Sequence, residues 1–335
     1  MNRGIWFYRV NFLVLFCVAV LCWSLSGNAY RDMQKQPQTT TFQNIEGLTA
    51  ADYEPMLRSE AQARDPLAFC LWAQADKQHI EGLGTGRIQA VSWVAVKGDV
   101  RLHFPAMQTL FEDDAFGCLI DRTTAEELFH SGNVVGSTVK MGGKEYTVRG
   151  VIDGPDRTMV TQLAGECLHP LTNITVSGTE MTETFLLRHG LSAANTVKTS
   201  QHLWLARIFH DFPVMAVLLV SLLLLGLLRG YWREYPIRKL LLSIGMLGIG
   251  TIVLFRLFTV IPEALIPTQW SDFEFWETAG RNFMRTCTDY IASAKYRPDL
   301  TWLYGVLGAS WGIVSALFIL CMYSLVSIHI GRPQN

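Results

Sequence analysis

The chain has 335 residues and a formal net charge of −1, from 28 basic and 29 acidic side chains. Nucleic-acid binders and polybasic membrane patches carry an excess of basic side chains, so this balance argues against both. Half of the residues are hydrophobic and 17% are charged, whereas soluble globular domains have about 25% charged residues. The deficit of charge indicates lipid-facing surface and excludes an ordinary cytosolic enzyme.

The first apolar segment is Trp6–Leu25, and a helix needs about 20 such residues to cross a bilayer. Arg9 lies near its start and has a stem long enough to reach the lipid headgroups. The following Gly27-Asn28-Ala29 has the small residues of a signal-peptide cleavage site. We expect an uncleaved anchor, because the apolar run is long for a signal peptide. Cleavage would leave three spans with the same sidedness.

A polar linker and a helix around Ala50–Ala63 lead into a region of strands. The sequence predicts strands at Phe69–Ala73, Gln89–Val96 and Arg101–Phe104. A short apolar strand, Gly117–Asp121, then stops at an aspartate. We expect Asp121 to be a helix-entry cap rather than a nucleophile.

The helix that follows has its own start signal. Thr123-Thr124-Ala125-Glu126 fits a capping box, in which Glu126 reaches back to the first free amide. The helix is predicted to end near Phe129. Beyond it, Gly142-Gly143 lies between two alternating segments and predicts a hairpin, because both turn positions require positive φ. Strands at Thr158–Leu163 and Asn173–Val176 complete a mixed α+β domain.

Three further spans are predicted after this domain. The amphipathic segment Ser200–Asp211 runs directly into the apolar run Phe212–Leu228, so it is either a helix that transmits motion or a simple interface helix. The other two runs are Leu240–Ile261, where Arg256 is the one charge, and the uncharged Trp302–Ile328. Soluble proteins rarely keep helices so free of charge, which favours membrane spans over buried helices.

Basic residues of the short loops predict the orientation by the positive-inside rule. Arg3 and Arg9 lie at the start of the first span, and Arg332 follows the last span. The link between the second and third spans carries Arg229, Arg233, Arg238 and Lys239, and Glu234 is its one acidic residue. We therefore expect a multi-pass protein of the cell membrane with both termini in the cytoplasm.

The predicted organisation has three parts. Residues 1–29 form a transmembrane anchor, and residues 30–211 form an extracytoplasmic α+β domain with its linker and stalk helix. Residues 212–335 supply three transmembrane helices. These three helices enclose a short basic cytoplasmic loop at 229–239 and an extracytoplasmic loop at 262–301, whose aromatic residues suggest an amphipathic helix.

Four of the seven cysteines lie outside the apolar runs, where a disulfide is chemically allowed. They are Cys70, Cys118, Cys167 and Cys287. Four cysteines allow three complete pairings, and sequence does not choose among them.

Catalytic and metal-binding signatures were sought along the whole chain. The sequence contains no zinc spacing, no HExxH, no GxSxG and no nucleotide-binding loop. We therefore expect no catalytic residue, no metal and no cofactor. A membrane enzyme is the weakest hypothesis, since its best candidate is Arg256, which lies about one helical turn from the outer membrane edge and is explained by snorkelling.

Several short motifs and their order resemble the MacB/FtsX-like superfamily of ABC transporter permeases. The motifs are Gly117-Cys118-Leu119-Ile120-Asp121, the helix Ala125–Phe129, Val135-Gly136 and Tyr146-Thr147-Val148-Arg149-Gly150-Val151. They look like the periplasmic core domain of that family. Phe69-Cys70-Leu71-Trp72-Ala73-Gln74 looks like a version found in related permease-like proteins. The order of one span, an outside domain and three spans also matches.

This resemblance implies a non-enzymatic permease subunit that moves its extracytoplasmic domain when a separate cytosolic ABC ATPase closes. Two such subunits would pair as a homodimer or as a heterodimer with a related permease. The resemblance assigns the ATPase-coupling loop to Arg229, Arg233, Glu234 and Arg238. Two departures argue against coupling: this loop is short and interrupted by Pro236, and the loop between the third and fourth spans is enlarged. The alternative is an ATPase-independent envelope protein whose outside domain binds or positions an extracellular partner.

Overall fold

The computed structural model describes residues 3–104, 110–153, 156–178, 182–231, 235–260, 273–292 and 295–330. The chain divides into two compact units. The helical unit comprises Met1–Lys35, His202–Met284 and Tyr304–Asn335. The sheet unit comprises Gln36–Gln201 and also Arg285–Leu303, a segment that is far from the rest of the unit in sequence.

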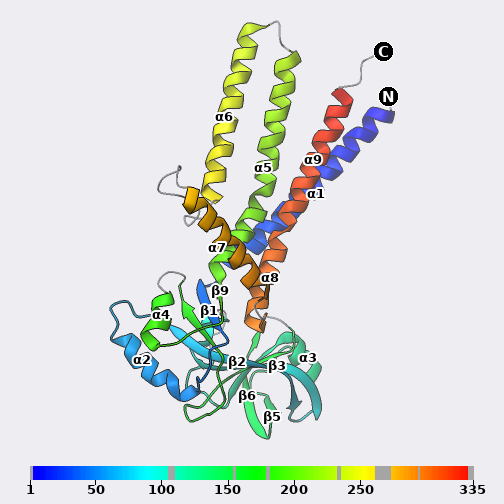
Figure 1. Ribbon diagram of the computed structural model, residues 1–335. Coiled ribbons are helices and arrows are strands. Elements are labelled where there is room, and N and C mark those ends of the chain that lie inside the picture. The colour runs from blue at the N-terminus through cyan, green and yellow to red at the C-terminus, as the bar shows by residue number, and fades with distance from the viewer. Residues whose placement is uncertain are drawn as a thin grey trace. The chain divides into compact units, whose positions relative to one another are not determined.

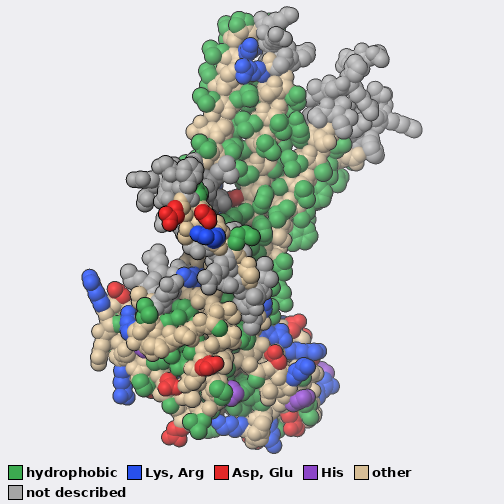
Figure 2. Space-filling view, viewed as in Figure 1, with side chains coloured by type: hydrophobic (Ala, Val, Ile, Leu, Met, Phe, Trp, Pro, Cys, Tyr) green, Lys and Arg blue, Asp and Glu red, His purple; other side chains and the backbone are tan. Residues whose placement is uncertain are grey.

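The long helices are α1 (Arg3–Gln34), α5 (Thr199–Tyr231), α6 (Pro236–Val260), α7 (Phe273–Ala292), α8 (Arg297–Ala309) and α9 (Trp311–Ile330), as Figure 1 shows. Four stretches of them are long and apolar enough to cross a membrane: Val10–Gln34, Thr199–Arg229, Pro236–Arg256 and Arg297–Leu325. Hydrophobic side chains cover these helices in Figure 2. The four predicted spans are therefore confirmed as candidate membrane helices, and α7 is the predicted amphipathic helix of the last loop.

The last span differs from the expectation of one unbroken helix. It is divided at Ser310 into α8 and α9. The Ser310 hydroxyl donates a hydrogen bond to the carbonyl oxygen of Leu307, at 2.6 Å. Serine side chains that bond the preceding turn bend helices, which accounts for the break.

Small residues let α1 pack closely against α8 and α9. The Ser26 hydroxyl donates to the carbonyl oxygen of Ala309, at 2.7 Å, and the Ser315 hydroxyl donates to that of Ala19, also at 2.7 Å. Gly312 lies so near the backbone of α5 that a Cβ there would collide with the carbonyl oxygen of Phe209. Small side chains and interhelical hydrogen bonds are the usual means of association between membrane helices.

The described residues of the sheet unit form nine strands, which Figure 1 labels in part. They are β1 (Thr39–Gln43), β2 (Phe69–Gly82), β3 (Arg87–Gly98), β4 (Gly117–Asp121), β5 (Thr138–Met141), β6 (Lys144–Ile152), β7 (Thr158–Gln162), β8 (Asn173–Ser177) and β9 (Asn195–Lys198). The short helices are α2 (Tyr53–Ala61), α3 (Arg122–Phe129) and α4 (Thr182–His189).

Six of the strands close into a ring. The strand order is β3-β7-β4-β6-β5-β2-β8-β1-β9, and β3 also pairs with β2. The ring therefore runs through β3, β7, β4, β6, β5 and β2, while β8, β1 and β9 extend from β2 as an open sheet. The pairs β3–β7 and β4–β6 are parallel, and the other pairs are antiparallel. This is the mixed α+β domain that the sequence predicts.

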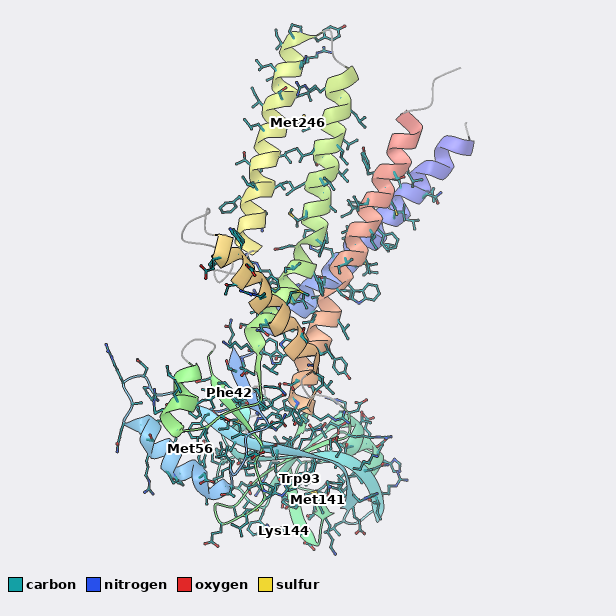
Figure 3. All side chains as sticks on the ribbon, in the orientation of Figure 1. Phe42, Met56, Trp93, Met141, Lys144 and Met246 are labelled. Atoms are coloured by element: carbon teal, nitrogen blue, oxygen red, sulfur yellow. The ribbon has the colours of Figure 1, made fainter. Side chains whose placement is uncertain are left out.

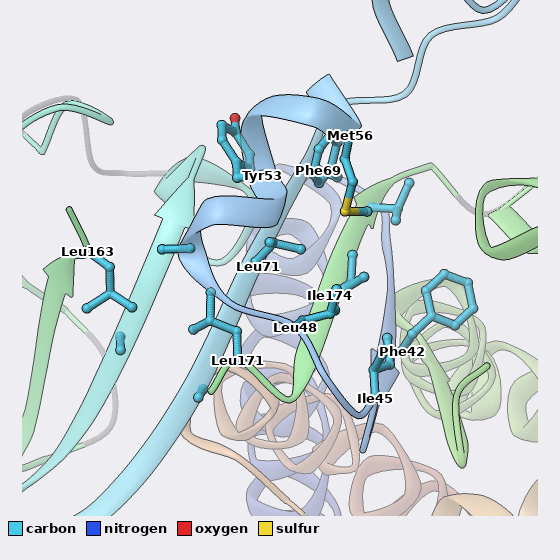
Figure 4. Close-up of a cluster of buried hydrophobic side chains, with 14 of the residues drawn as sticks. Phe42, Ile45, Leu48, Tyr53, Met56, Phe69, Leu71, Leu163, Leu171 and Ile174 are labelled. Carbon is cyan, nitrogen blue, oxygen red and sulfur yellow. The ribbon is translucent and has the colours of Figure 1, made fainter. Parts of the chain in front are cut away.

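The long strand β2 belongs to both the ring and the open sheet. Its side chains alternate between the two faces of the sheet. Phe69 and Leu71 face one hydrophobic cluster, whereas Cys70 and Trp72 face another. Figure 4 shows Phe42, Leu71 and Ile174 from three neighbouring strands in the first cluster, where Tyr53 and Met56 of α2 cover them. A bulge between Ala75 and Gln78 then lets the rest of β2 pair with β5 in the ring.

The local predictions around β4 are largely confirmed. Strand β4 and the end of α3 lie where expected, and Gly142 and Gly143 take φ values of 55° and 85° in the hairpin. The predicted capping box was wrong. Asp121, not Thr123, is the N-cap residue, and its carboxylate accepts the amides of Thr124 at 3.1 Å and Thr158 at 2.7 Å.

Other local predictions failed in short polar segments. The predicted strand at Arg101–Phe104 is a 3-10 turn, Val100–Leu102, because the carboxylate of Asp99 accepts the amide of Arg101 at 2.9 Å. Strands β1 and β9 and helix α4 were missed. Each is at most eight residues long and carries little hydrophobic periodicity.

Glu60 joins α2 to α4. Its buried carboxylate accepts the amide of Leu67 at 3.0 Å and is paired with Arg188 at 2.6 Å and His189 at 2.9 Å. Burial alone would raise the pKa of Glu60, but these hydrogen bonds outweigh it and lower the pKa below its usual range. The ionised form is therefore the one that stabilises the fold.

We predict that Glu60→Gln lowers the free energy of unfolding by roughly 2 kcal/mol near neutral pH. This loss is smaller than the loss for a fully buried ion pair, because Arg188 stays partly exposed. Since the folded pKa is depressed, the stabilisation is present above the unfolded pKa and is lost as the pH falls through the lower folded pKa. Thermal unfolding of the detergent-solubilised chain should show a weaker acid dependence in the variant. Glu54→Gln, on the exposed face of α2, is the control; equal acid dependence in Glu60→Gln and the unsubstituted chain would contradict the assignment.

Gly312→Ala tests the packing of the helical unit. The added methyl group has no room beside Phe209, so we expect a loss of about 1–3 kcal/mol and a lower melting temperature. Gly248→Ala is the matched control, since nothing lies within 4 Å of a Cβ at that position. A melting temperature of Gly312→Ala equal to or above that of the control would refute the close contact.

Candidate functional site

The predicted coupling loop is described only in part. Arg229 lies in the last turn of α5, and Arg238 lies in the first turn of α6; both side chains are exposed. The guanidinium of Arg238 lies 4.9 Å from the centre of the Tyr235 ring. Arg233 and Glu234 lie outside the described residues. Figure 2 shows basic side chains gathered at the end of this helix pair.

The four cysteines proposed for disulfides are placed as follows. Cys70, Cys118 and Cys167 are free thiols, and the side chain of Cys287, in α7, is not among those described. Cys70 and Cys118 are fully buried in different hydrophobic clusters. Burial raises the pKa of the Cys118 thiol to about 12 and that of Cys70 still further, so both remain protonated.

Within the described ranges, no group of three or more His, Cys, Asp or Glu side chains is arranged to hold a metal ion. The most elaborate polar arrangement is instead found where the chain enters the last span. We call residues 295–303 the docked segment. It includes the start of α8 and belongs to the sheet unit.

Tyr296 and Arg297 attach the docked segment to β2 and β3. The Tyr296 ring packs edge-on against Trp72, with 5.2 Å between ring centres, and adjoins the hydrophobic cluster around it. The amide of Arg297 donates to Oε1 of Gln74 at 2.7 Å, and its Nε donates to the hydroxyl of Ser92 at 3.0 Å. Burial raises the pKa of the Tyr296 phenol, while a hydrogen bond with Asn173 acts in the opposite direction.

Asp299 attaches the same segment to β1. Its Oδ2 accepts Nε2 of Gln43 at 3.3 Å and the amide of Tyr296 at 3.2 Å. The second bond caps the first turn of α8, as an acidic residue at the third helical position does in a capping box. One carboxylate, 9% exposed, therefore both starts the helix and holds it on the sheet.

The face of the sheet that receives Asp299 is polar although it is buried. The hydroxyl of Thr175 on β8 accepts Nε1 of Trp72 at 3.0 Å and shares a hydrogen bond with Thr41 of β1 at 2.9 Å. Gln43 and Asn173 are fully buried on the same two strands. Buried polar groups are costly unless they are hydrogen-bonded, so this face requires polar partners such as those of the docked segment.

Sequence reasoning missed these residues. Arg297-Pro298-Asp299 before an apolar run is a usable helix-start signal. However, no pattern in the sequence connects this tripeptide with Gln43, Gln74 and Ser92, which lie more than two hundred residues earlier.

We predict that Arg297→Ala increases hydrogen exchange in residues 295–303 by roughly tenfold or more, since hydrogen bonds of charged groups contribute about 1.5–3 kcal/mol. Hydrogen-exchange mass spectrometry of the solubilised chain measures this. Arg281→Ala is the control, because Arg281 is exposed on α7 and pairs only within its own helix among the described residues, with Glu277 at 3.3 Å. Unchanged exchange in Arg297→Ala would show that the segment is held by other contacts.

Thiol accessibility gives a separate test. A maleimide added to the native chain should label the half-buried Cys167 but neither Cys70 nor Cys118, which should react only after denaturation. Peptide mass spectrometry identifies the labelled sites. Labelling of Cys118 at the rate of Cys167 in the native chain would contradict its burial, and resistance of Cys167 after denaturation without reductant would indicate a disulfide.

Comparison with known proteins finds one matching domain family and solved structures of similar domains. The sequence model of the MacB-like periplasmic core domain matches residues 23–197, slightly more than half of the chain. The chain is similar to the periplasmic region of MacB from Actinobacillus actinomycetemcomitans, with 13% identity and a TM-score of 0.36, over 49% of this chain and 90% of that one. It is also similar to the extracellular domain of the noncanonic ABC-type transporter YknZ from Gram-positive bacteria, with 11% identity and a TM-score of 0.35, over 48% and 98% of the two chains.

No curated protein matches the chain. The domain match extends from within α1 through the sheet unit to β9, and it adjoins the three further candidate spans. The chain is thus a membrane protein with an extracytoplasmic domain, and it belongs to the family of proteins that carry the MacB-like periplasmic core domain.

Proposed function

We propose that the chain is the non-enzymatic permease subunit of an ABC transporter, and that it couples a separate cytosolic ATPase to motion of its extracytoplasmic sheet unit. The observation that carries this proposal is the attachment of the docked segment. The start of α8 is hydrogen-bonded to Gln43, Gln74 and Ser92 of the sheet, and the same helix begins the fourth candidate span. Displacement of that span then moves the sheet.

Two further connections support mechanical coupling. Strand β9 ends at Lys198 and α5 begins at Thr199, so no linker separates them. The hydroxyl of Thr199 donates to the carbonyl oxygen of Thr39 at 3.0 Å and accepts its amide at 2.8 Å. Between α1 and β1 there are only residues 35–38. Short connections transmit displacement, whereas long flexible linkers absorb it.

In this proposal both termini and the α5–α6 link face the cytoplasm. The basic side chains of Arg229, Arg238 and Lys239 favour that side by the positive-inside rule. The ATPase contacts the link, and two permease subunits pair around two ATPases. The work done is transport or mechanotransmission. Nucleic acid and enzymatic cofactors have no part in it.

The brevity of the link favours a second candidate function. Tyr231 ends α5 and Pro236 begins α6, so four residues separate the helices. A contact surface of this size is small for an ATPase. The alternative is an envelope protein that keeps the fold but works without ATP, with its extracytoplasmic domain binding or positioning another protein.

Charge reversal in the link separates the two candidates. Arg238→Glu, alone and with Arg229→Glu, should abolish co-purification of a cytosolic ATPase with the tagged chain, because the reversed charges repel a surface that accepts basic side chains. Affinity purification in mild detergent followed by mass spectrometry measures the association. Insertion should be retained, as checked by protease protection of the extracytoplasmic domain.

The control is Lys144→Glu, an exposed charge reversal at the β5–β6 hairpin of the sheet unit, labelled in Figure 3. It should leave ATPase association intact. If an ATPase co-purifies equally with all variants, the link is not its docking site. If none co-purifies with the unsubstituted chain, the ATPase-independent alternative is the better account.

A further inference from the structure

A groove of about 410 Å³ runs along α1 near the end that leads into the extracytoplasmic domain. Its lining residues on α1 recur at helical spacing, from Val20 and Trp23 to Tyr30, Arg31 and Gln34. His210 of α5 forms the other wall. All of these residues belong to the helical unit, and neither the fold nor the proposed coupling mechanism uses them.

The aromatic wall of the groove is ordered by packing. The His210 ring stacks with Tyr30 and with Trp23, at 5.4 and 6.2 Å between ring centres and at angles of 19° and 26°. Gly27 permits this approach, since a Cβ there would lie 3.2 Å from His210 Cε1. The hydroxyl of Ser26 lies 3.4 Å from His210 Nδ1. The groove is therefore a built feature of the α1–α5 contact.

The outer end of the groove carries a cation. Arg31 Nη2 donates to Oδ1 of Asn28 at 2.6 Å, and its Nε donates to the carbonyl oxygen of Gly27 at 3.2 Å. Both acceptors are neutral. The neighbouring charges form pairs of their own, Asp32 with Lys35 at 2.7 Å and Arg207 with Asp211 at 3.9 Å, and Asp32 also attracts Arg31 at longer range. An anion at Arg31 would complement its charge.

The groove also changes character along its length. Val20 and Trp23 are apolar and nearly half exposed, whereas Arg31 and Gln34 are polar. At about 1.5 Å per residue, Val20 and Gln34 are roughly 21 Å apart along α1. Because α1 leads into the extracytoplasmic domain, the polar end lies at the outer membrane interface, where Trp and Tyr side chains are favoured. An occupant must therefore be anionic at one end and apolar at the other.

We propose that this groove binds an anionic phospholipid of the outer leaflet. Its phosphate lies at Arg31, and an acyl chain follows Trp23 and Val20 towards the bilayer centre. The site is a lipid site of the permease itself and does not depend on whether an ATPase is coupled.

The test is native mass spectrometry of the full chain in detergent, titrated with palmitoyl-oleoyl phosphatidylglycerol or the corresponding phosphatidylcholine. Phosphatidylglycerol should bind more tightly. Arg31→Gln should weaken its binding by roughly fivefold, as expected for one basic residue near a lipid headgroup, and Arg31→Lys should retain most of it. Trp23→Ala should weaken both lipids. Lys35→Gln, just after the end of α1, should have no effect.

Several outcomes would overturn the proposal. Equal affinity for the two lipids, or equal losses in Arg31→Gln and Lys35→Gln, would remove the specific role of Arg31. Competition by inorganic phosphate as effective as that by the lipid would assign the site to a free anion. Unchanged lipid binding in Arg31→Gln together with a shift to monomer would assign the groove to a second copy of the chain. The melting temperature of Arg31→Lys should match that of the unsubstituted chain, which shows that lipid binding by this variant is measured on folded protein.

Discussion

The sheet unit depends on the burial of polar side chains on one face of β1, β8 and β2. Gln43, Asn173 and Thr175 cannot face solvent there, so each must find a hydrogen-bonding partner within the protein. The docked segment supplies Asp299 and Tyr296 for this purpose, and Trp72 and Thr41 complete the set. Detaching the segment would break its hydrogen bonds to Gln43, Gln74 and Ser92, each worth about 1 kcal/mol or more. The sheet and the start of α8 are consequently one mechanical body.

Much of the fold could be predicted because its signals are local. Long apolar runs with at most one charge each identified all four candidate spans, and Gly142-Gly143 identified the hairpin, in which both glycines have positive φ values. Strand β2 was predicted too short, since its second half follows a bulge and is half-exposed. Strand β1 was missed because Thr39–Gln43 is almost entirely polar. Its burial comes from β8 and β9 on either side, which no local pattern records.

The candidate site was hardly predictable, for the same reason. Asp299 reads from sequence as an ordinary acidic residue in a first helical turn, and its contact with Gln43 joins residues 256 positions apart. The coupling loop is a prediction from resemblance, and two of its four residues lie outside the described part of the chain. Cys70 and Cys118 were candidates for disulfides because they lie outside the apolar runs. Their burial in separate hydrophobic clusters as free thiols accounts for them as core residues.

The central claim is that a conformational change of a cytosolic ATPase is transmitted to the sheet through the helices that are attached to the sheet. Hydrogen-exchange mass spectrometry of the purified permease–ATPase complex, with and without a non-hydrolysable ATP analogue, tests this most directly. The account predicts that nucleotide changes exchange in residues 295–303 and in β1 together, because hydrogen bonds make them one body. Exchange that responds in the α5–α6 link but stays constant in both of these segments would contradict it.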